Sequence, residues 1–171
     1  MNPTERVFAY IDGYNLYYGL KSKGWKKFYW LNIKAMAVDL LKPHQSLIRT
    51  KYFTTIIKRP RGKHDRQHAF LEALQTCSDF DIFYGHYLSS QVTCHNCGHS
   101  YYTHHEKMTD VNIAVELLMD SFNNRFDMAL LVSADSDLVG PGDLKPSSRL
   151  HRQGWLGHQE SLRVRLGPDE R

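Results

Sequence analysis

Four acidic residues have the type and placement needed to hold a divalent metal ion: Asp12, Asp110, Asp135 and Asp137. Carboxylates that are brought close together repel one another, so either some of them take up protons or a cation neutralises them. Mg²⁺ prefers oxygen ligands of this kind, and a bound ion can polarise a phosphate and activate a water for in-line attack. The four residues therefore indicate metal-assisted phosphodiester chemistry, provided that the fold brings them together.

Each of these acids also has an ordinary structural explanation. Asp110 precedes an apolar helical segment and could be an N-cap or a first-turn acid. Asp135 and Asp137 could be turn residues. Asp12 is harder to explain in this way, because it ends an apolar run just before Gly13, and an acid buried there without a partner is costly.

The elements that would position these acids alternate along the chain. Apolar and β-branched runs predict strands at residues 6–12, 47–57, 80–88 and 127–133. The helical spacing of apolar residues predicts helices at residues 14–23, 32–41, 64–77 and 111–122. This alternation predicts an α/β fold with a mostly parallel sheet that is covered by helices on both faces.

In a sheet of this kind, ligands bind beyond the carboxyl ends of the strands, at the point where the strand order reverses. Asp12 follows the first predicted strand, and Asp135 and Asp137 follow the fourth. Asp110 lies at the start of the last predicted helix, whose apolar residues must pack on the sheet. We therefore expect the four acids to converge at one edge of the sheet.

The last part of the chain breaks the alternation. Residues 140–171 contain five Gly and three Pro, and no Phe, Tyr, Ile or Met. We find neither a strand nor a convincing helix there, and the composition favours disorder or a replaced domain end. We predict one domain over residues 1–139 and a disordered or non-native tail over residues 140–171, with the C-terminal part of the fold truncated or replaced.

The overall composition is typical of a soluble globular domain, with 42% hydrophobic and 23% charged residues in a chain of 171. No apolar run approaches the roughly 20 residues of a membrane span, and the N-terminus lacks a secretory signal. We therefore expect a cytoplasmic protein without membrane contact. The net charge of +4 does not by itself indicate nucleic acid, and nothing indicates the oligomeric state.

Three motifs occur together: IDGYN at residues 11–15, EKxxDV at residues 106–111 and VSADSD at residues 132–137. Their order and spacing resemble those of the NYN domain, the LabA-like branch of the PIN-like nuclease superfamily. The resemblance covers about residues 5–139. It implies a three-layer α/β/α, PIN-like (Rossmann-like) domain that cleaves RNA with Mg²⁺ or Mn²⁺.

The resemblance also implies roles for individual residues. At the matching positions, Asp12, Asp110 and Asp135 would bind the metal, and Asp137 would be a further ligand or would position water. The tail departs from the family pattern, in which a helix and another strand follow the last acidic motif.

Contacts with RNA are expected from a second group of residues. By resemblance, Asn15 would orient the first aspartate or contact the substrate, Lys107 would face the phosphate backbone and Ser133 would hydrogen-bond a carboxylate. The densest basic cluster, at residues 58–66, would track phosphates, and exposed aromatic residues near the first motif would stack on unpaired bases. We predict that Arg59 and Arg61 of the basic cluster and Tyr14 of the aromatic residues contact the RNA. Many of the other aromatic residues are expected in the core.

Residues 89–107 form a polar segment rich in His and Cys, and we expect a loop inserted before the last helix. Cys94 and Cys97 are a CxxC pair with the spacing of zinc ligands, and His99, His104 or His105 could complete a tetrahedral site. A structural Zn²⁺ would explain how so long a loop is ordered. The alternative is a surface loop with free thiols.

The favoured function is therefore a metal-dependent ribonuclease that cleaves RNA phosphodiester bonds internally. The first alternative is a non-catalytic RNA-binding or regulatory NYN module that uses the same site without turnover. A phosphatase of the aspartyl-phosphate type is disfavoured, because that chemistry needs a second Asp two residues after the first, where this chain has Tyr14.

Overall fold

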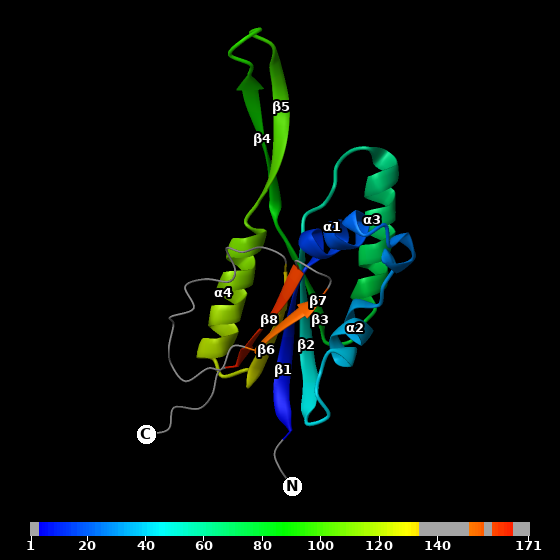
Figure 1. Cartoon of the computed structure of the whole chain (residues 1–171), viewed down its shortest axis with the longest axis vertical. Coiled ribbons are helices and arrows are strands. Elements are labelled where there is room, and N and C mark those ends of the chain that lie inside the picture. Colours follow the sequence, from blue (N-terminus) through cyan, green and yellow to red (C-terminus); the bar gives the residue numbers. More distant parts are fainter. Residues whose placement is uncertain (1–3, 134–150, 156–158, 166–171) are drawn as a thin grey trace.

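A computed structural model describes residues 4–133, 151–155 and 159–165 (Figure 1). The strands are β1 (Glu5–Asp12), β2 (Gln45–Thr54), β3 (Phe80–Tyr84), β4 (His86–Thr93), β5 (Ser100–Lys107), β6 (Met128–Val132), β7 (His151–Trp155) and β8 (Gln159–Arg165). The helices are α1 (Gly13–Ser22), α2 (Ile33–Asp39), α3 (Arg61–Gln75) and α4 (Thr109–Phe122), with a short 3-10 helix, η1, at Lys26–Phe28.

The larger sheet has the strand order β3-β2-β1-β6-β8-β7, and its first four strands are parallel. From β1 the chain builds outward through β2 to β3 and then returns to place β6 on the other side of β1. The strand order therefore reverses between β1 and β6. The predicted α/β fold with a mostly parallel sheet is confirmed.

The sheet is the middle of three layers (Figure 1). On one face, Val7, Ala9 and Ile11 of β1 pack with residues of α2 and α3. On the other face, Phe8 and Tyr10 pack against Ile113 of α4. This alternation of buried side chains along β1 is what two covered faces require, because successive side chains of a strand point to opposite faces.

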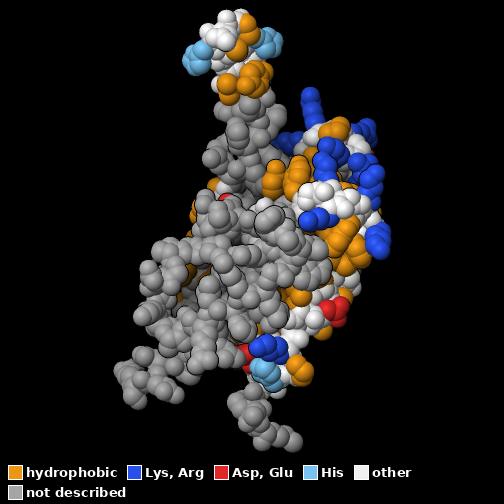
Figure 2. Space-filling model, in the orientation of Figure 1, with side chains coloured by type: hydrophobic (Ala, Val, Ile, Leu, Met, Phe, Trp, Pro, Cys, Tyr) orange, Lys and Arg blue, Asp and Glu red, His pale blue; other side chains and the backbone are white. Residues whose placement is uncertain are grey.

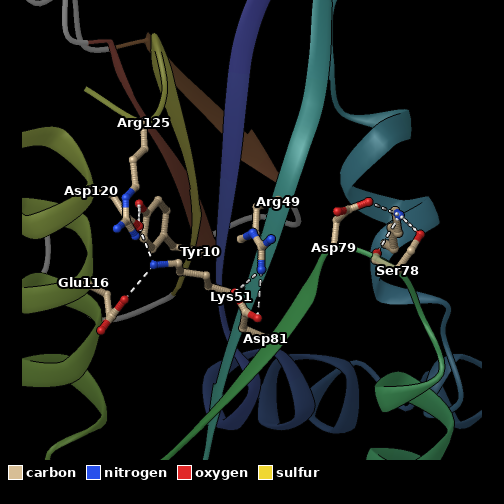
Figure 3. A network of polar contacts seen from close by, with 10 residues as sticks. Tyr10, Arg49, Lys51, Ser78, Asp79, Asp81, Glu116, Asp120 and Arg125 are labelled. Carbon is tan, nitrogen blue, oxygen red and sulfur yellow. Dashed lines mark hydrogen bonds and ion pairs between the residues drawn. The ribbon is translucent and has the colours of Figure 1, made fainter. Parts of the chain in front are cut away.

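A buried polar network fastens α4 to the sheet (Figure 3). Lys51 of β2 is 3% exposed, and its Nζ lies 2.6 Å from Glu116 Oε2 and 2.5 Å from Asp120 Oδ2. The Tyr10 hydroxyl donates to the same Asp120 oxygen at 2.7 Å, and Arg125 Nη1 lies 3.2 Å from Oδ1. Since Asp120 is 1% exposed, its charge depends on these partners.

Residues 89–107 do not form the predicted loop, so that prediction is wrong. β4 and β5 pair along their whole length as an antiparallel hairpin that projects from the domain (Figure 1). The predicted strand at residues 80–88 is split at Gly85, whose N–H still bonds to Thr54 O before the chain leaves the sheet. The polar composition concealed a hairpin, because few apolar residues mark its two strands in the sequence.

The tail also differs from expectation, since β8 pairs with β6 and β7 pairs with β8, both antiparallel. No strand was predicted there. The sequence of β8 alternates polar residues with Leu162 and Val164, which is a strand pattern of period two. The expectation of disorder rested instead on the Gly and Pro content of the whole tail. The predicted domain boundary at residue 139 lies outside the described residues and stays a prediction. In the described part of the chain, no helix is long and apolar enough to cross a membrane.

Loss of Lys51 should lower the stability of the folded protein. Lys51→Ala leaves the carboxylates of Glu116 and Asp120 without their shared cation, and one of them is almost fully buried. We expect a loss of about 3–5 kcal/mol in the free energy of unfolding, measured by urea denaturation. The matched control is Arg49→Ala on the same strand.

Arg49 makes an exposed pair with Asp81, with Nη1 2.9 Å from Oδ2. Pairs of this kind contribute no more than about 1 kcal/mol, so the control variant should remain close to the parent protein. A loss of stability in Lys51→Ala as small as that expected for the control would show that the buried network does not stabilise the fold.

Candidate functional site

Asp12 is a carboxylate buried at the end of β1, with 1% of its surface exposed. It follows Ile11, which is fully buried, and it is the N-cap of α1, where its Oδ1 accepts from Asn15 N at 3.0 Å. Helix capping accounts for this one oxygen. It does not require the residue to be acidic, since Ser, Thr or Asn cap as well.

The second carboxylate oxygen joins two strands of the sheet. Asp12 Oδ2 accepts from Asn15 Nδ2 at 2.5 Å and from Ser133 Oγ at 3.0 Å, and Asn15 Nδ2 also lies 3.1 Å from Ser133 Oγ. Ser133 is the residue directly after β6. The three side chains therefore link the ends of β1 and β6, the two strands between which the strand order reverses and where open α/β sheets bind ligands.

The charge of Asp12 has no basic partner among the residues that the structure describes. Its hydrogen bonds come from an amide, a hydroxyl and a backbone N–H, all of which are neutral. Asp120, which is buried to the same extent, has Lys51 and Arg125 beside it. The oxygens of Asp12 thus fit a bound cation, because a buried charge needs compensation and hard divalent ions take carboxylate oxygens.

Asp110 lies in the first turn of α4 and is exposed. The helix follows Met108, whose left-handed backbone, with φ of 78°, turns the chain from β5 into α4. α4 runs antiparallel to β1 and begins at the end of the sheet where β1 finishes (Figure 1). Asp110 and Asp12 therefore lie at the same end of the sheet.

The other two predicted metal ligands, Asp135 and Asp137, lie outside the described residues, just after Ser133. Within the part of the chain that is described, no group of three or more His, Cys, Asp or Glu side chains could hold a metal ion. The fourfold carboxylate site thus stays a prediction, for which the structure supplies one buried acid and the end of a helix that carries a second.

Gly13 lies directly against Tyr52 of β2. A Cβ atom placed on Gly13 would be 2.4 Å from the Tyr52 hydroxyl oxygen, so no larger residue fits without moving the ring. Burial and the neighbouring Asp12 charge raise the pKa of Tyr52 above its ordinary value. The phenol consequently stays neutral beside the carboxylate.

A cavity of about 580 Å³ opens beside this turn, on the face of the sheet covered by α1 and α3. The predicted substrate residues Tyr14 and Arg59 line it. Arg61 does not line this cavity: its side chain is 95% exposed and lies 3.9 Å from Asp65. Lys107 belongs to β5, and its side chain is outside the described part of the structure.

Gln67, which no sequence pattern indicated, holds one wall of the cavity in place. Gln67 Oε1 accepts from Ile57 N at 2.8 Å, and Nε2 donates to Thr55 O at 2.9 Å. The side-chain amide of α3 thereby fixes the chain where it leaves β2. A single Gln on a polar helix face has no sequence signal that separates it from its solvated neighbours.

The tip of the β4–β5 hairpin holds Cys94 and Cys97. Gly98 N donates to Cys94 O at 2.9 Å, Cys94 N donates to His99 O at 2.9 Å, and Gly98 has a positive φ of 66°. Hydrogen bonds from the backbone of Cys97 and then of Asn96 lower the pKa of the Cys94 thiol. A lowered pKa makes the thiolate, which is the form that binds metals, easier to reach. The side chain of His105 is not described, so the predicted ligand set of Cys94, Cys97, His99 and His105 is not tested.

The sequence profile described as the NYN domain matches residues 6–142, which is most of the chain. The matched region includes all three motifs. No curated protein matches the chain, and no solved structure does.

Proposed function

The chain belongs to the NYN domain family, and from this membership and the geometry at the end of β1 we propose that it is a divalent-metal-dependent ribonuclease. The family favours a nuclease-like function on RNA. The LabA-like branch and the identity of the metal are part of the proposal.

One observation carries the proposal. A carboxylate that is 1% exposed stands at the point of strand-order reversal, and none of its partners in the described part of the chain carries a positive charge. A fold that needed only a helix cap there would be served by an uncharged residue. A buried acid at this place is explained by a cation that the protein binds for its chemistry.

In this proposal Asp12, Asp110, Asp135 and Asp137 hold Mg²⁺ or Mn²⁺. When bound, such an ion would supply polarisation of the scissile phosphate and activation of a water. Asn15 and Ser133 orient Asp12 by holding its Oδ2, as residues behind a metal ligand commonly do. Arg59 binds the RNA backbone from the neighbouring cavity, and in the proposal Lys107 and the exposed Arg61 contribute to the same surface.

The first test is RNA cleavage with and without divalent metal. We expect metal-dependent cleavage that falls by more than about a hundredfold in Asp12→Asn, and by about 10–100-fold in Ser133→Ala, which acts through Asp12. Asp81→Asn is the matched control, because it removes one carboxylate from a surface pair on β3. Product formation is followed on a labelled single-stranded RNA.

Cleavage that persists in Asp12→Asn would contradict the proposal. RNA binding without any metal-dependent cleavage by the parent protein would instead favour the second candidate, a non-catalytic RNA-binding module. That candidate is supported by the basic side chains around the cavity, which bind phosphates whether or not a metal is present.

A second test measures the metal without substrate. A ligand present at a hundred times its dissociation constant stabilises a protein by about 2.7 kcal/mol, so Mg²⁺ should raise the melting temperature of the parent protein. Asp12→Asn should lose this response and should be at least as stable as the parent protein in EDTA, because it no longer buries an uncompensated charge. An equal rise with Mg²⁺ in both proteins would exclude Asp12 as a ligand.

For the hairpin tip we propose a structural Zn²⁺ held by Cys94, Cys97, His99 and His105. The support is the CxxC spacing together with the backbone hydrogen bonds that lower the pKa of the Cys94 thiol. A metal there would stabilise the end of a hairpin that projects from the domain (Figure 1).

Metal analysis tests this proposal. The purified chain should carry close to one zinc per molecule, and a variant with both Cys94→Ala and Cys97→Ala should carry none. Cys77→Ala is the control, since Cys77 follows α3, away from the hairpin. Absence of zinc from the parent protein would remove the proposal and would leave a tip with free thiols.

A further inference from the structure

The cavity beside Gly13 has a lining that the metal site does not explain. Its walls come from α1, η1, the end of β2 and α3, and its volume of about 580 Å³ lies within the 300–1,000 Å³ range of small-molecule sites. Figure 2 shows Lys and Arg side chains gathered around hydrophobic ones over this part of the molecule. The cavity thus combines an apolar interior with a basic surround.

The apolar part is largely aromatic. From α1 the rings of Tyr14 and Tyr18 lie 4.5 Å apart, with Tyr18 and Tyr17 at 5.3 Å. On the side of α3, Trp30 meets Phe70 edge to face at 6.0 Å. Tyr14, Tyr18 and Trp30 are 41%, 45% and 57% exposed, which is far from the burial of core residues. Partly exposed rings that are held in place by their neighbours offer a platform for a planar ligand, and Lys21 Nζ lies 5.3 Å from the centroid of the Tyr18 ring.

The basic part has no counter-charge of its own. Five of the lining residues are Lys or Arg, none is Asp or Glu, and the five are Lys21, Lys58, Arg59, Lys63 and Arg66. In the described part of the chain, none of these five lies in a salt bridge, whereas nearby Arg61 lies close to Asp65. Unpaired cations around an apolar hollow call for a ligand with several negative charges.

Part of the wall is held in shape by the side-chain amide of Gln67. Gln67 Nε2 bonds to Thr55 O and lies 3.4 Å from Thr54 Oγ1, while its Oε1 accepts from Ile57 N. These bonds join α3 to the end of β2, so the wall opposite α1 is fixed in place.

The position of the cavity relates it to Asp12. Gly13 and Tyr14 both line it, and they directly follow the candidate metal ligand in the chain. Tyr52 joins the two, since it lines the cavity and its hydroxyl lies against Gly13. A nucleotide bound here would place its own phosphates at the basic rim and its neighbour's phosphate close to Asp12.

From these observations we propose that the cavity holds one unpaired nucleobase of the RNA, stacked on its aromatic wall, so that the protein binds the RNA through this base as well as through its phosphates. This proposal rests on the proposed ribonuclease function for the identity of the polymer. A base inside a duplex is stacked on both faces by its neighbours and cannot enter, so a fully paired RNA is excluded by shape.

Binding in EDTA tests the proposal apart from catalysis. The probes are a labelled single-stranded oligouridylate of about ten nucleotides, an abasic strand with the same phosphates, and a duplex that contains the oligouridylate. We expect the single strand to bind at least about tenfold more tightly than either of the others, a difference that stacking of one base supplies. The single strand alone should quench the fluorescence of Trp30.

Variants identify the surface. Trp30→Ala and Tyr18→Ala should each bring the affinity for the single strand close to that for the abasic strand, and Trp30→Phe should remove the quenching while it keeps most of the affinity. Tyr101→Ala on the β4–β5 hairpin is the matched control, since Tyr101 is 48% exposed and lies outside the cavity. A melting curve for each variant establishes that it is folded.

Equal affinity for the intact and abasic strands, or an equal loss in Tyr101→Ala and Tyr18→Ala, would overturn the proposal, as would the absence of binding to any of the three probes. A strong preference for the single strand by a protein that never cleaves RNA would support base binding in the cavity and refute the proposed ribonuclease function. Cleavage without a preference for the single strand would support the ribonuclease function and refute base binding in the cavity.

Discussion

The structure around β1 depends on how each buried negative charge is compensated. Two aspartates, Asp12 and Asp120, are each 1% exposed, and the chain treats them in opposite ways. Asp120 is matched by Lys51 and Arg125 and serves to hold α4 on the sheet. Asp12 receives only neutral donors from the described residues, at the edge where a parallel sheet binds ligands. The difference in partners separates a structural acid from a candidate catalytic one.

The two roles are connected through α4. The helix carries Asp110 in its first turn and the contacts to Lys51 at Glu116 and Asp120, further along. A helix that is fixed by buried ion pairs cannot slide along the sheet without breaking them. The position of its N-terminus relative to the end of β1 is therefore set by charges about two turns away, where the helix meets Lys51 of the sheet.

Much of this could be predicted from the sequence, because the decisive signals are local. The apolar run before Asp12, the N-cap at Asn32 and the helical spacing after Asp110 depend only on neighbouring residues, and the structure has β1, α2 and α4 at these places. The β4–β5 hairpin was missed because its polar residues resemble a loop. The partners of Lys51 were missed because Glu116 and Asp120 lie 65 and 69 positions further along the chain, and a salt bridge over such a separation produces no pattern in the sequence.

The contact between Gly13 and Tyr52 has a consequence for how this region can vary. Glycine is required there because a phenol ring occupies the space that a side chain would need, although the backbone itself is helical. That ring is also part of the floor under the bound nucleotide proposed above. A side chain at Gly13 would therefore displace the Tyr52 ring and disturb the end of β1 and the proposed nucleotide cavity in one step, and a larger residue at position 13 fits only where position 52 carries a smaller one.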